Sequence, residues 1–162
     1  MKLKACAIVF SLLLISSCGF HLRGSVTLPS GLESLHLESS VGESDLLQAL
    51  RRAITAADVN LLDTPGLGVY SLGIGQEEID ERVLSVNSNA RAGEYELSIS
   101  VPVQVRSGQV VVIGPEILTI EKVYLADPDN AVAKQEEREI MEDEIRQELV
   151  LQILRRLQTF TP

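Results

Sequence analysis

The sequence is poor in aromatic residues, cysteine and histidine. It has no tryptophan, three phenylalanines, three tyrosines, two cysteines and two histidines among 162 residues. Cys6 lies inside an apolar N-terminal segment and Cys18 directly behind it, so a disulfide is not expected in the folded part. His21 and His36 lack the local acids or thiols of a metal site. We therefore expect no metal and no cofactor, and a fold that rests on an aliphatic core.

Basic residues are also scarce. Lysine and arginine number 14 against 23 aspartates and glutamates, a formal net charge of −9. This balance argues against broad nucleic-acid binding and against a basic surface spread over anionic lipid. Beyond the N-terminal segment, no apolar run is long enough to cross a membrane. Any anion site must therefore be built from a few local cations.

The sequence contains no recognisable catalytic arrangement. Ser34 and His36 share one strand face, but no nearby acid would orient the imidazole. The glycines of segment 66–75 lack the helix start that makes a phosphate loop. The carboxylate pairs Glu77-Glu78 and Glu136-Glu137 are interpreted as solvated surface and not as acid and base. We expect a protein that is not an enzyme; a lipid-anchored hydrolase would need a nucleophile and a base that are missing.

The N-terminus has the layout of an export signal. Lys2 and Lys4 precede an apolar stretch over residues 5–15, which is too short to span a bilayer, and Ser16 and Ser17 precede Cys18. A branched apolar residue, two small residues and a cysteine resemble the bacterial lipobox. We expect residues 1–17 to be removed and Cys18 to be acylated. The alternative is a plain secretory signal cleaved nearby, with Cys18 an incidental thiol.

The mature chain would be strongly acidic and of single-domain size. Removal of residues 1–17 takes two lysines and no acid, which leaves 12 basic and 23 acidic residues and a formal charge of −11. We expect residues 18–31 to form a lipidated N-terminus and linker, and residues 32–162 one domain. Two or more acyl chains hold a protein stably on a membrane. Gly19 stands where an aspartate would favour inner-membrane retention, so the outer membrane is expected.

Hydrophobic periodicity predicts the first elements of the domain. Segment 32–38 alternates as a short strand. Ser40 and Glu43 are spaced like a capping box, and apolar residues then recur at helical spacing until Asp58. Segment 67–74 is apolar and rich in glycine, which predicts a second strand.

The second half of the chain carries the clearest patterns. Tyr95 to Val105 alternates strictly as a half-buried strand, and Pro102 on its polar side indicates an edge or a bulge. Segments 109–113 and 117–125 form the second arm of a hairpin that Gly114-Pro115 interrupts. Asp127 is the expected N-cap of a helix that runs to about Leu157, with Pro128 at its first position. Its apolar stripe comprises Ile140, Met141, Ile145, Leu149, Ile153 and Leu157.

This order of elements predicts an α+β two-layer sandwich, in which two helices cover one face of a mainly antiparallel, about four-stranded sheet. The other face would carry polar residues: Glu94, Glu96, Ser98, Ser100 and Gln104. Such a face is either solvated or lines the polar interior of a partner.

Three segments resemble the LptE lipopolysaccharide-assembly lipoprotein family. The first is Cys18-Gly19-Phe20-His21-Leu22-Arg23-Gly24, the second covers residues 89–97 with Arg91-Ala92-Gly93-Glu94-Tyr95, and the third is Ala131-Val132-Ala133-Lys134. They occur in family order and the similarity extends over the mature chain. Ala90 departs from the pattern, because many relatives have glycine there, so the turn before Arg91 can differ.

The resemblance implies a non-enzymatic partner protein. LptE-like lipoproteins are anchored in the inner leaflet of the Gram-negative outer membrane and lie largely inside the β-barrel of LptD, about one to one. The pair delivers lipopolysaccharide to the cell surface. The family fold is a sandwich of two helices on a four-stranded sheet. The alternative from another class is a free-standing lipoprotein that carries an amphiphile, but the aromatic residues are too few to line a cavity.

Matching of the family motifs suggests two lipopolysaccharide contacts, Lys134 and Arg91. Both are cations in acidic surroundings, suited to lipid A phosphates. Alternatively, Lys134 pairs with an acid such as Glu137, and Arg91 is solvated. Residues 19–23 (Gly19, Phe20, His21, Leu22 and Arg23) either dock on the barrel wall or serve as a spacer.

Overall fold

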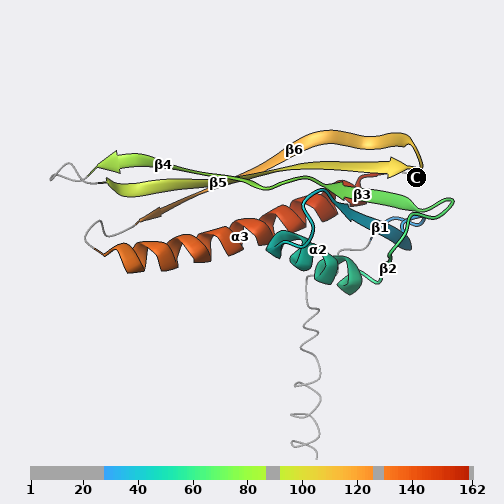
Figure 1. Cartoon of the computed structure of the whole chain (residues 1–162), viewed down its shortest axis with the longest axis horizontal. Coiled ribbons are helices and arrows are strands. Elements are labelled where there is room, and N and C mark those ends of the chain that lie inside the picture. The colour runs from blue at the N-terminus through green and yellow to red at the C-terminus, as the bar shows by residue number, and fades with distance from the viewer. Residues whose placement is uncertain (1–27, 87–91, 126–129, 161–162) are drawn as a thin grey trace, which may run out of the picture.

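The computed structural model describes residues 28–86, 92–125 and 130–160. Six strands form one sheet and two helices lie against one of its faces (Figure 1). The helices are α2 (Asp45–Ala56) and α3 (Ala131–Gln158). The strands are β1 (Ser34–Ser39), β2 (Asn60–Leu62), β3 (Tyr70–Ile74), β4 (Glu78–Val86), β5 (Ala92–Ser107) and β6 (Val110–Leu125).

The sheet is mixed. Its order is β2-β1-β3-β5-β4, and β6 pairs with β5 outside this path. β1 runs parallel to β2 and β3, whereas the pairings of β5 with β3, β4 and β6 are antiparallel. The predicted α+β sandwich with helices on one face is confirmed, with six strands in place of about four. β2 escaped prediction because it has only three residues, and β4 because charged side chains dominate it.

β5 organises the sheet, because it pairs with β6 along one edge and with two strands in succession along the other. β4 pairs with it up to Ser100 and β3 from Val103 onward. Pro102 lies between these pairings, and its carbonyl oxygen accepts a 2.8 Å hydrogen bond from the Gly75 N–H. The N–H that proline lacks would point to the same side, where the ladder changes partner. The expected edge or bulge is therefore a change of partner strand inside the sheet.

The core lies between the helices and the inner face of the sheet. The alternate residues of β5 that the sequence predicted to be inward are buried: Leu97, Ile99, Val101, Val103 and Val105. α2 contributes Leu46, Leu47, Leu50 and Ile54, and α3 contributes Ile145, Leu149, Val150, Ile153, Leu154 and Leu157. At one end, the rings of Tyr70 and Phe160 meet edge to face with centroids 5.2 Å apart.

Both helices begin later than the sequence predicted. The N-cap of α2 is Ser44 and not Ser40, since Ser44 Oγ accepts a hydrogen bond from the Leu47 N–H at 3.2 Å. The N-cap of α3 is Asn130, whose side chain accepts from the Ala133 N–H. The predicted cap Asp127 and Pro128 lie outside the described residues.

Two strand predictions also change. β3 begins at Tyr70, and Leu67 before it is exposed. β6 is one continuous strand through Gly114 and Pro115, and its register against β5 shifts between Val103 and Arg106. A bulge, and not a break, therefore accommodates this glycine and proline.

Candidate functional site

The sheet-facing side of α3 changes character along the helix. From Ile145 to Leu157 it buries apolar residues, whereas its first half carries none that is buried. Lys134, Arg138 and Arg146 instead meet acids of β4 and the segment before it. Glu142 lies between the two arginines at helical spacing and pairs with both of them along α3. Ile140 is exposed, so its place in the predicted apolar stripe is wrong, whereas Met141 is partly buried against the core. The sandwich thus has an apolar half and a charged half.

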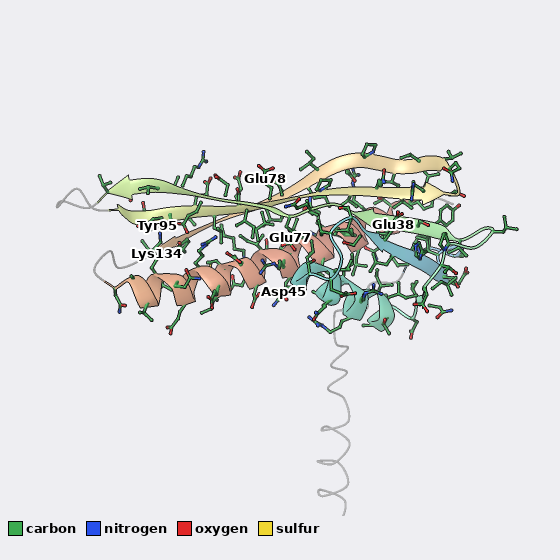
Figure 2. The ribbon with its side chains drawn as sticks, in the orientation of Figure 1. Glu38, Asp45, Glu77, Glu78, Tyr95 and Lys134 are labelled. Carbon is green, nitrogen blue, oxygen red and sulfur yellow. The ribbon has the colours of Figure 1, made fainter. Side chains whose placement is uncertain are left out.

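Lys134 is the centre of the charged half. Its Nζ donates a 2.7 Å hydrogen bond to Glu81 Oε1 and lies 3.7 Å from the centroid of the Tyr95 ring. Lys134 and Tyr95 face each other between α3 and the sheet (Figure 2). The lysine side chain is 30% exposed. The ammonium is therefore held by a carboxylate and an aromatic face but still reaches solvent.

Two tyrosines complete this arrangement. The Tyr124 hydroxyl donates a 2.6 Å hydrogen bond to Glu81 Oε2, and the rings of Tyr95 and Tyr124 stack with centroids 5.5 Å apart. Burial raises the pKa of Tyr124, and the hydrogen bond to Glu81 and the charge of that carboxylate raise it further. Tyr124 therefore remains a neutral donor at physiological pH.

Glu81 remains ionised. Burial raises the pKa of Glu81, but hydrogen bonds from Lys134 and Tyr124, and the charges of Lys134 and Arg138, outweigh burial and hold the pKa below its usual value. Both carboxylate oxygens have partners. Glu81 thus ties β4 to α3 through Lys134 and to β6 through Tyr124.

A second set of ion pairs continues toward the apolar half. Arg146 Nε donates to Glu77 at 2.9 Å, and Arg146 also donates to Glu142 at 3.1 Å. The side chains of Arg146 and Glu77 are 13% and 14% exposed. Glu77 points toward α3, whereas Glu78 lies on the opposite face of the sheet (Figure 2). The interpretation of Glu77 as solvated surface is therefore wrong; Glu136 and Glu137 are exposed as expected.

The sequence found Lys134 but not its partners. Glu81 on β4 binds Lys134, in place of the expected Glu137. Glu81 could have been predicted from the alternation Ile79, Glu81, Val83, because a carboxylate there interrupts an otherwise apolar strand face. Several predicted residues lie outside the described part of the chain, and the structure does not place them: Arg91, Cys18, Gly19, Phe20, His21, Leu22 and Arg23.

The described residues contain neither a metal-ligand group nor a helix that could span a membrane. Among residues 28–86, 92–125 and 130–160, no three His, Cys, Asp or Glu side chains are grouped so that they could hold a metal ion. The ring of His36 is engaged by the carbonyl oxygen of Leu62, 3.0 Å from Nδ1. In the same described part, neither α2 nor α3 is long and apolar enough to cross a membrane.

Comparison with protein families identifies the fold and its role. Residues 32–157 match the family model described as LptE, Lipopolysaccharide-assembly. The chain belongs to the LptE family. The matched span runs from the residues before β1 to the last turn of α3 and includes Glu81, Tyr95, Tyr124 and Lys134.

Relatives named LPS-assembly lipoprotein LptE agree with this assignment. The protein of Yersinia pestis (strain Pestoides F) is 30% identical over 159 residues, which cover 92% of this chain and 72% of the relative. That of Pectobacterium atrosepticum is 27% identical over 154 residues, which cover 92% of this chain and 81% of the relative.

Solved structures of lipoproteins share the fold. The crystal structure of rare lipoprotein B from Shewanella oneidensis aligns with a TM-score of 0.69 at 27% identity and covers 76% of this chain and 92% of that chain. The solution structure of lipoprotein B from Nitrosomonas europaea aligns with a TM-score of 0.72 at 21% identity, over 88% and 92% of the two chains. The second likeness concerns the fold alone.

The LptE family is a lipopolysaccharide-assembly family of lipoproteins and not an enzyme family. The predicted family is confirmed. In this member of the family, the charged half of the sandwich joins α3 to the sheet through ion pairs and hydrogen bonds.

Proposed function

We propose that this LptE-family lipoprotein fills and partners an LptD-type β-barrel in the outer membrane, as a heterodimer of about one to one, and assists lipopolysaccharide assembly at the cell surface. Membership of the lipopolysaccharide-assembly family carries the proposal. The protein acts through its partners and not through a reaction of its own.

The proposed membrane attachment is the lipid on Cys18. Residues 1–17 are the signal peptide that is removed, residues 18–31 form the lipidated N-terminus and linker, and residues 32–162 form the domain. The anchor lies in the periplasmic side of the outer membrane, and the domain lies largely inside the barrel. Phe20 and Leu22 dock on the barrel wall beside the bilayer, and Arg23 meets acidic groups.

The uncovered face of the sheet supports the partner role. Both helices lie on the other face (Figure 1). The open face carries polar side chains of the paired strands β4 and β5: Glu78, Asp80, Arg82, Glu96, Ser98, Ser100 and Gln104. The lumen of an outer-membrane barrel is itself polar, so these side chains of β4 and β5 can face polar groups of the barrel there.

The alternative role, a free-standing carrier of an amphiphile, lacks such support. A carrier needs an enclosed apolar cavity. A hollow of about 510 Å³ between α2 and α3, lined in part by Ala49, Ala53, Val150 and Leu151, is an open groove. The buried apolar residues of both helices belong to the core between the helices and the sheet.

Affinity purification of the mature lipoprotein from detergent-solubilised outer membranes tests the partnership. We expect a stoichiometric outer-membrane barrel protein to be recovered with it. Recovery of the lipoprotein alone would contradict the proposal and favour the free-standing role.

We further propose that Lys134 and Arg91 contact the phosphates of lipopolysaccharide. A lysine ammonium has three donors, and Glu81 accepts one of them from Lys134. Lys134 contacts Tyr95, which follows Arg91 by four residues in the sequence. A phosphate can share the ammonium with Glu81 or displace that carboxylate.

Two neighbouring substitutions separate binding from structure. Lys134→Gln removes the cation, whereas Glu81→Gln leaves the cation and removes its partner. If Lys134 binds phosphate, Lys134→Gln weakens binding of lipopolysaccharide to the purified complex, and Glu81→Gln preserves or strengthens it. Equal binding by the two variants and the unsubstituted protein would contradict this contact, and recovery of the barrel with each variant controls for folding.

A further inference from the structure

We propose that the free edge of β6, over residues 116–125, receives an extended segment of the barrel partner as an added strand. The proposal rests on the proposed function in one respect: the segment belongs to the barrel protein. The β6 edge would pair with that segment through main-chain hydrogen bonds.

β6 presents a long unpaired edge. In the described part of the chain β6 pairs with β5 alone, so the N–H and C=O groups of its alternate residues point away from the sheet. Such an edge is a template for another strand, and proteins usually blunt it with charges, proline, bulges or short length. β6 has 16 residues, and its glycine, proline and bulge lie before residue 116.

The charges on this part of β6 do not protect the edge. Lys122 Nζ turns toward α3 and binds Glu144 at 2.9 Å and Glu148 at 2.7 Å. Glu116 accepts a 2.9 Å hydrogen bond from Arg156 Nε. Among residues 116–125, Glu121 is the charged residue without such a partner on α3. These charged residues therefore do little to prevent another strand from pairing with the β6 edge.

Apolar side chains flank the same edge on both faces of the sheet. Ile117, Val123 and Leu125 lie on the open face and are 69%, 55% and 68% exposed. On the helix side, a hollow of about 290 Å³ is lined by Val123, Tyr124, Leu125, Glu137, Ile140 and Met141. An added strand sends its side chains alternately to the two faces, beside the exposed row and toward Ile140 and Met141. The fitting segment is extended, with apolar residues at successive positions.

The opposite edge of the same part of the sheet provides a contrast. β4 also pairs with β5 alone in the described residues, but it is shorter, with nine residues, and its Glu78 and Asp80 are exposed acids on the open face. Charges at this density oppose strand addition. β4 is therefore the internal control for any measurement on β6.

Charge argues against a second copy of this chain as the occupant. The register that pairs Ile117 with Leu125 of another β6 in antiparallel fashion places two Glu121 side chains directly opposite each other, and like charges in that position are destabilising. The chain as a whole carries a formal charge of −9. A segment of a different, less acidic chain avoids both costs.

Hydrogen exchange of the affinity-purified lipoprotein–barrel complex tests the proposal against the free lipoprotein in the same detergent. Amides of residues 117–125 that point away from β5 should exchange about tenfold more slowly, or slower still, in the complex. Amides along β4 should not gain protection. Unchanged exchange of the β6 amides in a complex that does contain the barrel would overturn this proposal and leave the proposed function intact.

A pair of matched variants sharpens the test. Val123→Lys adds an edge charge to β6, and Val86→Lys adds the same charge to β4 at a side chain that is 62% exposed. We expect the first to abolish the added protection and the second to retain it. Equal protection in both variants would contradict the proposal. Protection of the β6 edge in the free lipoprotein, with a dimer in sedimentation, would overturn it in favour of a second copy, and absence of any recovered barrel protein would overturn it together with the proposed function.

Discussion

The backbone at Gly75 lies directly against the ring of Pro102. A Cβ built there lies 2.8 to 2.9 Å from ring atoms of Pro102, shorter than real Cβ contacts. The Gly75 N–H binds the Pro102 carbonyl at 2.8 Å, so neither segment can move away without losing that bond. The place where β5 changes partner therefore depends on the absence of a side chain.

Gly75→Ala should lower the free energy of unfolding by about 1–3 kcal/mol, the usual cost of overpacking. Gly93→Ala is the matched control, because a Cβ at Gly93 meets no atom within 4 Å. Chemical denaturation of the two variants measures the difference. Equal stability of the two variants would show that the Pro102 ring moves aside for the added methyl group without a loss of stability.

Glu81 makes stability depend on pH. Its pKa is lowered in the folded protein, so the unfolded chain binds more protons between the two pKa values, and stability rises with pH across that interval. The contribution is complete above the ordinary value of 4.5 and is lost as the pH falls through the folded value.

We expect Glu81→Gln to lower the free energy of unfolding by about 1–2 kcal/mol at pH 7, since it removes charge-assisted hydrogen bonds from Lys134 and Tyr124. The difference from the unsubstituted protein should shrink as the pH falls below about 4. Glu137→Gln, on the exposed side of α3, is the control. If the difference in free energy of unfolding did not change with pH, Glu81 would contribute through packing and not through its charge.

At the scale of elements, the two halves of α3 contact the sheet through different chemistry. At about 1.5 Å per residue its 28 residues span roughly 42 Å. Its second half closes the apolar core, whereas its first half is joined to the sheet by ion pairs. Buried ion pairs contribute little net free energy to folding, because the charges lose their hydration. The apolar half therefore supplies most of the free energy that holds α3 on the sheet.

Leu149→Ala should cost about 2–5 kcal/mol, because Leu149 is fully buried and its removal leaves a cavity. Leu151→Ala, two residues away and exposed, should change stability by no more than about 0.5 kcal/mol. Thermal or denaturant unfolding compares the two. A similar cost for both would mean that the second half of α3 is not the main contact.

The elements also show what periodicity can and cannot predict. The alternation of Tyr95 to Val105 was sufficient to predict β5, its buried face and its polar face. β4 was missed because its inward residues include Glu81, whose burial is made tolerable by Lys134, a residue 53 positions away. Local pattern does not encode such a partner. The cap Ser44 was not predicted for a simpler reason, because Ser40 and Glu43 have the spacing of a capping box four residues earlier.

At the scale of the whole molecule, three surfaces remain open to partners. We propose the polar sheet face for a polar lumen, the β6 edge for an added strand and the exposed side of Lys134 for a phosphate. All three belong to a chain of the lipopolysaccharide-assembly family. The family could be predicted from its motifs, whereas the positions of the edge strand and of the charged half required the structure.

We propose that this protein functions through its partnership with a barrel. The mass of the affinity-purified complex, measured intact in detergent, tests this partnership most directly. We expect one barrel protein and one copy of this chain that begins at Cys18 and carries covalent lipid. A mass that corresponds to this chain alone, or to copies of this chain without a barrel, would contradict the partnership.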